Sequence, residues 1–292
     1  MNGGFLLIKK DREISSNSLD NRVKRALSFS KVGHLGTLDP LAEGLLILMV
    51  DRATKLAKYF DDLDKVYELE IRLGARTRSL DLEGEITDFK EVNFEGQDDL
   101  IDETLKSFIG KSSQIPPLAS AIKVNGKKLY ELERQNIDYT PKGRDVELID
   151  VKRISDIKTI DNNTYFTCLC HTSKGYYVRS LARDFGDKLN VPSLASGINR
   201  VKVGKFSVDN AYTLSDIENG NYKLINPLDY LDFKRVNLDD TTDLKNGVWI
   251  KNIYGNHEYI IFCDKKGTPI AISKLDTTKN VYRIDTMLEL WR

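Results

Sequence analysis

The residue types best suited to chemistry lie together at 33–44, in the sequence GHLGTLDPLAEG. Its three glycines permit a tight, irregular backbone, and Pro40 disfavours helical geometry at Asp39. Asp39 therefore falls on a turn or an extended loop, shortly before the apolar residues 45–50. A carboxylate on a loop that a rigid element anchors is a frequent catalytic placement. An aspartate that only caps a turn is the commoner interpretation of an Asp-Pro pair.

Hydrophobic patterns predict the elements that would hold this loop. Alternation over residues 66–73 predicts a strand with Tyr67 on its apolar face. Serines 15 and 16 precede an apolar stripe of helical spacing and predict a capped helix that continues to about residue 27. Further helices are expected near 53–60, 101–108, 178–189 and directly after 213–216, with a strand at 165–171. Short strands at 248–250, 259–263, 270–273 and 281–284 predict a small β domain at the C-terminal end.

Composition restricts the class of protein. The 292 residues are 40% apolar and 30% charged, which is ordinary for a globular chain. The longest apolar run has six residues, at 45–50, whereas a membrane helix needs about 20. Three cysteines without framework spacing argue against a secreted disulfide scaffold. The N-terminal segment lacks the pattern of a signal peptide, so the sequence favours a cytoplasmic protein.

Charge is balanced overall but uneven along the chain. The 44 basic side chains equal the 44 acidic ones, which is unlike the uniformly basic character of many nucleic-acid-binding proteins. Residues 1–60 nevertheless carry ten basic side chains against six acidic ones, and residues 116–144 carry six against three. A local basic surface can attract a polyanion even on a neutral protein.

Six segments, in order, resemble the motifs of the TruB family of pseudouridine synthases. The loop at 33–44 resembles the family signature G-H-x-G-T-L-D-P-x-A-x-G. The other segments are RATKL at 52–56, KVYE at 65–68, LGARTRSLDLEG at 73–84, the stretch 114–130, and SKGYYVRS at 173–180. Six ordered motifs across about residues 3–206 are much more specific than one pattern.

The resemblance implies conversion of uridine 55 to pseudouridine in the T loop of tRNA. In that reaction the C1′–N1 bond breaks, the uracil turns and a C1′–C5 bond forms. Asp39 matches the family's nucleophile, and Arg179 matches the arginine that pairs with it and would keep the carboxylate ionised. Tyr67 matches the tyrosine that stacks on the uracil and is proposed to move a proton. From spacing alone, Arg179 is equally well a surface charge, and Tyr67 is more simply a core tyrosine.

Other positions match residues that contact RNA in the family. Tyr177 and Ile198 match the lining of the base pocket, and His34 matches a histidine that fills the space left by a flipped base. Residues 114–144 resemble a thumb insertion that closes over the T loop. The basic side chains that we expect at the RNA are Lys10, Lys127 and Lys128.

The resemblance also implies an α+β fold in two parts. Residues 1–232 would form a pseudouridine synthase catalytic domain with a mixed or antiparallel sheet, and residues 233–292 a small PUA-like domain resembling a β-barrel. No cofactor or metal is expected, because Cys168 and Cys170 lack zinc spacing and suit buried positions. The expected partner is the T stem-loop of tRNA, with no membrane, no obligate protein partner and a monomeric protein.

Three other functions stay open from the sequence. An RNA-guided relative would share the signature loop but act on another RNA. A tRNA-folding chaperone would bind the same RNA without catalysis. An unrelated hydrolase using Asp39 would need a second carboxylate at acid–base distance, and no paired motif stands out.

Overall fold

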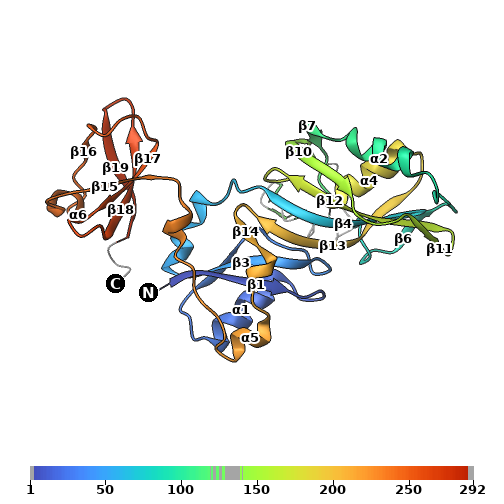
Figure 1. The fold of residues 1–292 in the computed structure, drawn as a ribbon, viewed down its shortest axis with the longest axis horizontal. Helices are drawn as coiled ribbons and strands as arrows, with labels where there is room; N and C mark the ends of the chain where they lie inside the picture. Colours follow the sequence, from blue (N-terminus) through green and yellow to red (C-terminus); the bar gives the residue numbers. More distant parts are fainter. Residues whose placement is uncertain are drawn as a thin grey trace.

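Ten strands form one mixed sheet (Figure 1). The computed structural model describes residues 3–118, 120, 123–124, 127–128, 139 and 141–288. The strand order is β1-β3-β13-β4-β12-β10-β7, with β2 beside β3, β14 beside β13 and β11 beside β12. The strands are β1 (Gly3–Lys10), β2 (Val32–Leu35), β3 (Glu43–Asp51), β4 (Lys65–Leu73), β7 (Gly110–Gln114), β10 (Arg144–Arg153), β11 (Lys158–Ile160), β12 (Asn163–Thr172), β13 (Ser193–Val203) and β14 (Phe206–Ser207). The short pairing of β13 with β3 is parallel, and it joins two antiparallel groups of strands. The expected α+β fold is confirmed.

β4 lies in the middle of this sheet. It pairs with β12, where Tyr67 is opposite Cys170, and with β13, where Tyr67 is opposite Arg200. Every second residue from Tyr67 to Leu73 is buried, and the residues between them are partly exposed. The strand predicted from alternation is therefore confirmed, and Tyr67 lies on its buried face.

Helices form where the apolar stripes predicted them. α1 (Ser16–Ala26) begins after Ser15, whose side chain accepts a hydrogen bond from the backbone N–H of Ser18. The remaining helices are η1 (Arg52–Tyr59), α2 (Asp98–Lys106), α4 (Val178–Lys188), η2 (Val208–Asn210), α5 (Leu214–Glu218), η3 (Pro227–Tyr230) and α6 (Thr242–Lys245), the η segments being 3₁₀ helices. Two small hairpins complete this part, formed by β5 (Ala75–Thr77) with β6 (Ile86–Phe89) and by β8 (Lys123–Val124) with β9 (Lys127–Lys128). No helix within the described ranges is long and apolar enough to cross a bilayer.

The alternation of β1 and β3 divides the interior into two cores. Leu6 and Ile8 of β1 face a core that includes the apolar residues of α1, α2 and α4. Phe5 and Leu7 face a second core, which includes η1 and reaches residues of the C-terminal strands such as Ile261 and Ile272. The N-terminal strands thus pack against the helices α1, α2 and α4 on one face and contact the C-terminal strands on the other.

The C-terminal strands form a separate five-stranded sheet at one end of the molecule (Figure 1). Its order is β15-β17-β18-β19-β16, with β15 (Lys234–Asn237), β16 (Ile250–Lys251), β17 (Tyr259–Cys263), β18 (Pro269–Asp276) and β19 (Val281–Met287). Three of the four predicted strands are confirmed. The strand expected at 248–250 was wrong in extent, because strand pairing begins only at Ile250, which lies opposite Tyr282. Val248 and Trp249 precede the paired residues and are exposed. β15 was not anticipated.

Candidate active site

The loop that carries Asp39 lies between β2 and β3 and is fixed to the core at two points. The ammonium group of Lys10 donates hydrogen bonds to the carbonyl oxygens of Asp11, Ile14 and Pro40, at 3.0, 2.8 and 3.1 Å. The Ser16 hydroxyl donates to the Leu38 carbonyl at 2.8 Å and accepts from the Leu38 N–H at 2.9 Å. These bonds hold the residues on both sides of Asp39, so its carboxylate has a defined position.

Arg179, in the first turn of α4, binds two carboxylates at once. Its Nη2 lies 3.0 Å from Asp39 Oδ2, and its Nη1 lies 3.0 Å from Asp81 Oδ2 and 2.8 Å from the Ser79 carbonyl oxygen. The side chains of Arg179 and Asp81 are 3% and 5% exposed, whereas that of Asp39 is 40% exposed. The buried carboxylate of Asp81 therefore holds the guanidinium in place, and the guanidinium in turn contacts the more exposed carboxylate of Asp39.

Asp81 is in turn fixed by its own loop. Its Oδ1 accepts hydrogen bonds from the Ser79 hydroxyl at 2.6 Å and from the Glu83 N–H at 3.0 Å. The intervening Leu80 has a φ of 63°, which few residues other than glycine adopt readily. Backbone strain of this kind persists where the surrounding contacts hold it, and here those contacts place the Asp81 carboxylate on Arg179.

The protonation of Asp39 is set by opposing effects. Burial raises the pKa of its carboxyl above the ordinary value, Arg179 lowers it, and the charge of Asp81 raises it. The 40% exposure of the side chain limits the effect of burial. The net effect is a pKa above the ordinary value of an aspartate, while the Arg179 guanidinium in direct contact favours the charged form that a nucleophile needs.

A cavity of about 300 Å³ opens above Asp39. Tyr67 from β4, Ile198 from β13 and Tyr177 at the start of α4 line it together with Asp39 and Arg179. Tyr67 and Ile198 are 9% and 7% exposed. The cavity combines flat apolar surface with one carboxylate, which suits a planar ring presented edge-on to a nucleophile.

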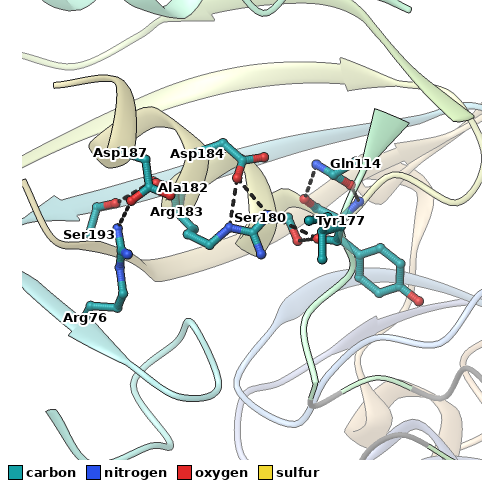
Figure 2. Close-up of polar contacts among 10 residues, drawn as sticks. Arg76, Gln114, Tyr177, Ser180, Ala182, Arg183, Asp184, Asp187 and Ser193 are labelled. Atoms are coloured by element: carbon teal, nitrogen blue, oxygen red, sulfur yellow. Dashed lines mark hydrogen bonds and ion pairs between the residues drawn. The ribbon is translucent and has the colours of Figure 1, made fainter. Parts of the chain in front are cut away.

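Tyr177 is held in place by an amide. Its backbone N–H donates to Gln114 Oε1 at 2.9 Å, and Gln114 Nε2 donates to its carbonyl oxygen at 3.1 Å, as Figure 2 shows. The next turn of α4 is fixed by the Ser180 hydroxyl, which donates to the Ile115 carbonyl at 2.8 Å. Burial raises the pKa of the Tyr177 phenol, so this ring is neutral in the pocket.

His34 lies beside the cavity without lining it. Its Nδ1 is 2.7 Å from Asp20 Oδ2 and its Nε2 is 3.1 Å from the hydroxyl of Thr37, which does line the cavity. The His34 side chain is 13% exposed. The imidazole is thus oriented by α1 and supports the loop, and its role in filling the space left by a flipped base stays a prediction.

The structure corrects the expectation for Lys10. This residue is 0% exposed and its ammonium group already serves three carbonyl oxygens, so it does not face RNA but fixes the catalytic loop. Burial also lowers its pKa to about 8. The side chains of Lys127 and Lys128 lie outside the described part of the chain, and their RNA contact stays a prediction.

Four residues that the sequence did not single out belong to this site. Asp81 and Gln114 position Arg179 and Tyr177, and Lys65 and Arg200 line the cavity. Lys65, Asp81 and Gln114 fall inside the motifs quoted above, and Arg200 follows Ile198 by two residues, but a motif does not state which of its members are buried. Their roles depend on contacts between segments that are distant in sequence.

A family model described as "TruB family pseudouridylate synthase (N terminal domain)" matches residues 24–178, which include Asp39, Tyr67 and Asp81. This chain belongs to the TruB family. The tRNA pseudouridine synthase B of Halalkalibacterium halodurans is 32% identical over 286 residues, covering 95% of this chain and 94% of that protein. The tRNA pseudouridine synthase B of Bacillus subtilis is 38% identical over 218 residues, covering 75% of this chain and 71% of that protein.

Solved structures support the fold of this TruB-family chain. A chain in the crystal structure of a Cbf5-Nop10-Gar1 complex superimposes with a TM-score of 0.66 at 18% identity, covering 97% of this chain and 84% of that one. At this identity the likeness concerns the fold alone. The resemblance inferred from six motifs is therefore confirmed for the family and for the architecture.

Proposed function

We propose that this protein isomerises uridine to pseudouridine in tRNA, at position 55 of the T loop. The observation that carries the proposal is the Asp39 carboxylate, held 3.0 Å from Arg179 at a cavity lined by Tyr67, Tyr177 and Ile198. The two relatives described above are named for this activity. The family membership and the chemistry of the site point to the same reaction.

The residues account for what the reaction needs. The target base must leave its stack to reach a carboxylate inside a cavity, and the rings of Tyr67 and Tyr177 offer surface on which it can stack. Asp39 is the nucleophile, and Arg179 keeps it ionised and oriented. The C1′–N1 bond breaks, the uracil turns, C1′ bonds to C5, C5 loses its proton and N1 gains one, so atoms and charge balance. The Tyr67 hydroxyl is placed to move a proton in the last stage.

Several finer points belong to the same proposal. We expect residues 1–232 to act as the catalytic domain and 233–292 as a PUA-like domain. We expect the T stem-loop to be the part of the tRNA that is bound. We expect the protein to act as a monomer in the cytoplasm, without an obligate protein partner or cofactor.

The experiment maps pseudouridine on an unmodified tRNA transcript after incubation with the protein. Carbodiimide labelling and primer extension locate the product, and Asp39→Ala and Asp39→Asn serve as the inactive comparisons. A stop at the T-loop position with the wild type alone is the expected result. Equal product with an Asp39 variant would overturn the nucleophile assignment. Binding without any product would favour the chaperone function or a missing guide RNA.

A further inference from the structure

We propose that Lys65 and Arg200 form a subsite for one backbone phosphate of the target nucleotide. The proposal rests on the proposed function, because it assigns a second part of the same RNA to the same cavity. Both side chains line the cavity that Asp39 faces. Lys65 is the first residue of β4, and Arg200 lies opposite Tyr67 on β13.

The two cationic groups converge at Gly36. A Cβ added to Gly36 would lie 3.4 Å from Arg200 Nη1 and 3.9 Å from Lys65 Cε. Gly36 has a φ of 71° and carries no side chain that could cover these groups. The open face of the loop at Gly36 is therefore bordered by a guanidinium and a lysine side chain.

Arg200 has an unused donor on this side. The residue is 1% exposed, its Nε donates to the Leu45 carbonyl and its Nη2 donates to the Gly36 carbonyl, both at 2.9 Å. In the part of the chain that the structure describes, its Nη1 has no partner. A buried guanidinium with a free N–H aimed at a cavity is suited to a ligand oxygen.

The Lys65 ammonium group donates a hydrogen bond to the Leu63 carbonyl oxygen, and Asp64 and Asp61 act on it through their charge, which raises its pKa. Among the described residues, no ion pair joins Lys65 or Arg200 to an acid, whereas Arg179 contacts two carboxylates. Burial and the neighbouring Arg200 lower the pKa of Lys65 to about 8. Two buried like charges side by side are stabilised when an anion binds between them.

The position of the pair identifies the anion. The charge of Arg200 is close enough to lower the pKa of Asp39, so the subsite adjoins the carboxylate that attacks the nucleotide. The anions that covalent structure places next to the reacting ribose are its own phosphodiester groups. Arginine and lysine donors bind such groups through charge-assisted hydrogen bonds.

The test combines variants with chemically neutral phosphates. T stem-loop RNAs carry a single methylphosphonate linkage on the 5′ or the 3′ side of the target uridine, and they are compared with unmodified RNA. Wild type, Lys65→Met, Lys65→Arg and the control Lys202→Met, an exposed lysine on β13 outside the cavity, are measured for RNA affinity and for pseudouridine formation. Thermal unfolding confirms that each variant is folded.

We expect one of the two linkages to weaken wild-type binding by about tenfold, as charge-assisted contacts of this kind do. Lys65→Met should bind unmodified RNA as weakly as the wild type binds the RNA with that linkage. The linkage should reduce the affinity of Lys65→Met little further. The slope of log affinity against log salt concentration should be smaller by about one than in the wild type. Lys202→Met should behave as the wild type. Lys65→Arg keeps the positive charge and should therefore keep the salt slope of binding and the sensitivity to that linkage, whatever its rate of pseudouridine formation.

Three results would overturn the subsite. The first is an RNA affinity of Lys65→Met equal to that of the wild type. The second is a loss of affinity from Lys65→Met that multiplies with the loss from each methylphosphonate linkage. The third is a loss of RNA affinity in Lys202→Met as large as that in Lys65→Met. Multiplying losses would place Lys65 on the base rather than on a phosphate. A wild type that binds RNA but forms no pseudouridine would contradict the proposed function, while the affinities would still decide the subsite.

Discussion

Asp81→Asn tests two roles of Asp81 separately: holding Arg179 in position, and raising the pKa of Asp39 through its negative charge. The change keeps the size of a side chain that is 5% exposed and removes its negative charge. Asp81 uses Oδ2 for Arg179 Nη1 and Oδ1 for the Ser79 hydroxyl and the Glu83 N–H. An amide has one oxygen, so in either orientation its NH₂ meets an N–H of Arg179 or of Glu83, and one hydrogen bond is lost.

The loss can be given a rough magnitude. A buried hydrogen bond that involves a charged group contributes about 1.5–3 kcal/mol. If that whole amount is lost from the transition state, in which Arg179 must orient the attacking carboxylate, kcat falls by about 10- to 150-fold. The free energy of unfolding should fall by a similar amount, because the same contact holds the loop of Asp81 to α4.

The pH profile gives a second, independent readout. The charge of Asp81 raises the pKa of Asp39, so its removal lowers that pKa. Activity requires the Asp39 carboxylate and disappears as pH falls through its pKa. The acidic limb of kcat/KM should therefore move to lower pH in Asp81→Asn, even though the maximal rate is smaller.

The assay is single-turnover pseudouridine formation between pH 4.5 and pH 8, with RNA affinity measured in parallel. Asp187→Asn is a matched control, because Asp187 lies on α4, as Arg179 does, pairs with Arg76 of β5 (Figure 2) and is 52% exposed. An acidic limb that stays in place or moves upward would refute the electrostatic reasoning. An unchanged kcat would refute the positioning role.

Three further changes probe the parts that hold the site. Lys10→Met removes the donor from three carbonyl oxygens around the loop at Pro40, so the free energy of unfolding measured in urea should fall by about 2–4 kcal/mol. A loss below about 0.5 kcal/mol would show that the loop does not depend on it. Tyr67→Phe keeps the ring and removes the hydroxyl, so RNA affinity should stay within about twofold while kcat falls by about 100-fold or more; full activity would leave the tyrosine a stacking role alone. Gln114→Ala breaks both bonds to Tyr177, and kcat/KM should fall by about tenfold; unchanged kinetics would show that α4 holds Tyr177 unaided.

Residues whose role is local could be predicted from the sequence. Asp39 stands out because Pro40 and the surrounding glycines define its loop, and Tyr67 follows from the alternation of β4. Arg179 became a candidate only through the family resemblance, and the structure supplies its reason, the ion pair to Asp39. The apolar periodicities placed α1, α4 and the central strands correctly because each has one buried face.

Lys10 shows a signal that could have been used. A strand places every second residue on one face, so Lys10 shares its face with Leu6 and Ile8, both 0% exposed. No strand was predicted at residues 3–10, and the burial of Lys10 could have been inferred from alternation had the apolar residues 5–8 been taken as a strand that continues to Lys10. Asp81 is different, because its contact with Arg179 spans 98 residues of sequence and no local pattern encodes it. Trp249 misled the strand prediction because its ring contacts the cations of Lys279 and Arg283 instead of a core.

The arrangement of charge explains how a chain with no net charge can present a site to a polyanion. Asp39 lines the cavity and shares Arg179 with the buried Asp81, so two carboxylates face one guanidinium at the reacting atom. Lys65 and Arg200 line the same cavity and form no ion pair with an acid in the part of the chain that the structure describes. The proposed subsite would attract an RNA phosphate to Lys65 and Arg200 and away from the two carboxylates, and would so orient the ribose before any base-specific contact forms. Specific placement of four or five charges therefore does what a uniformly basic surface does less selectively.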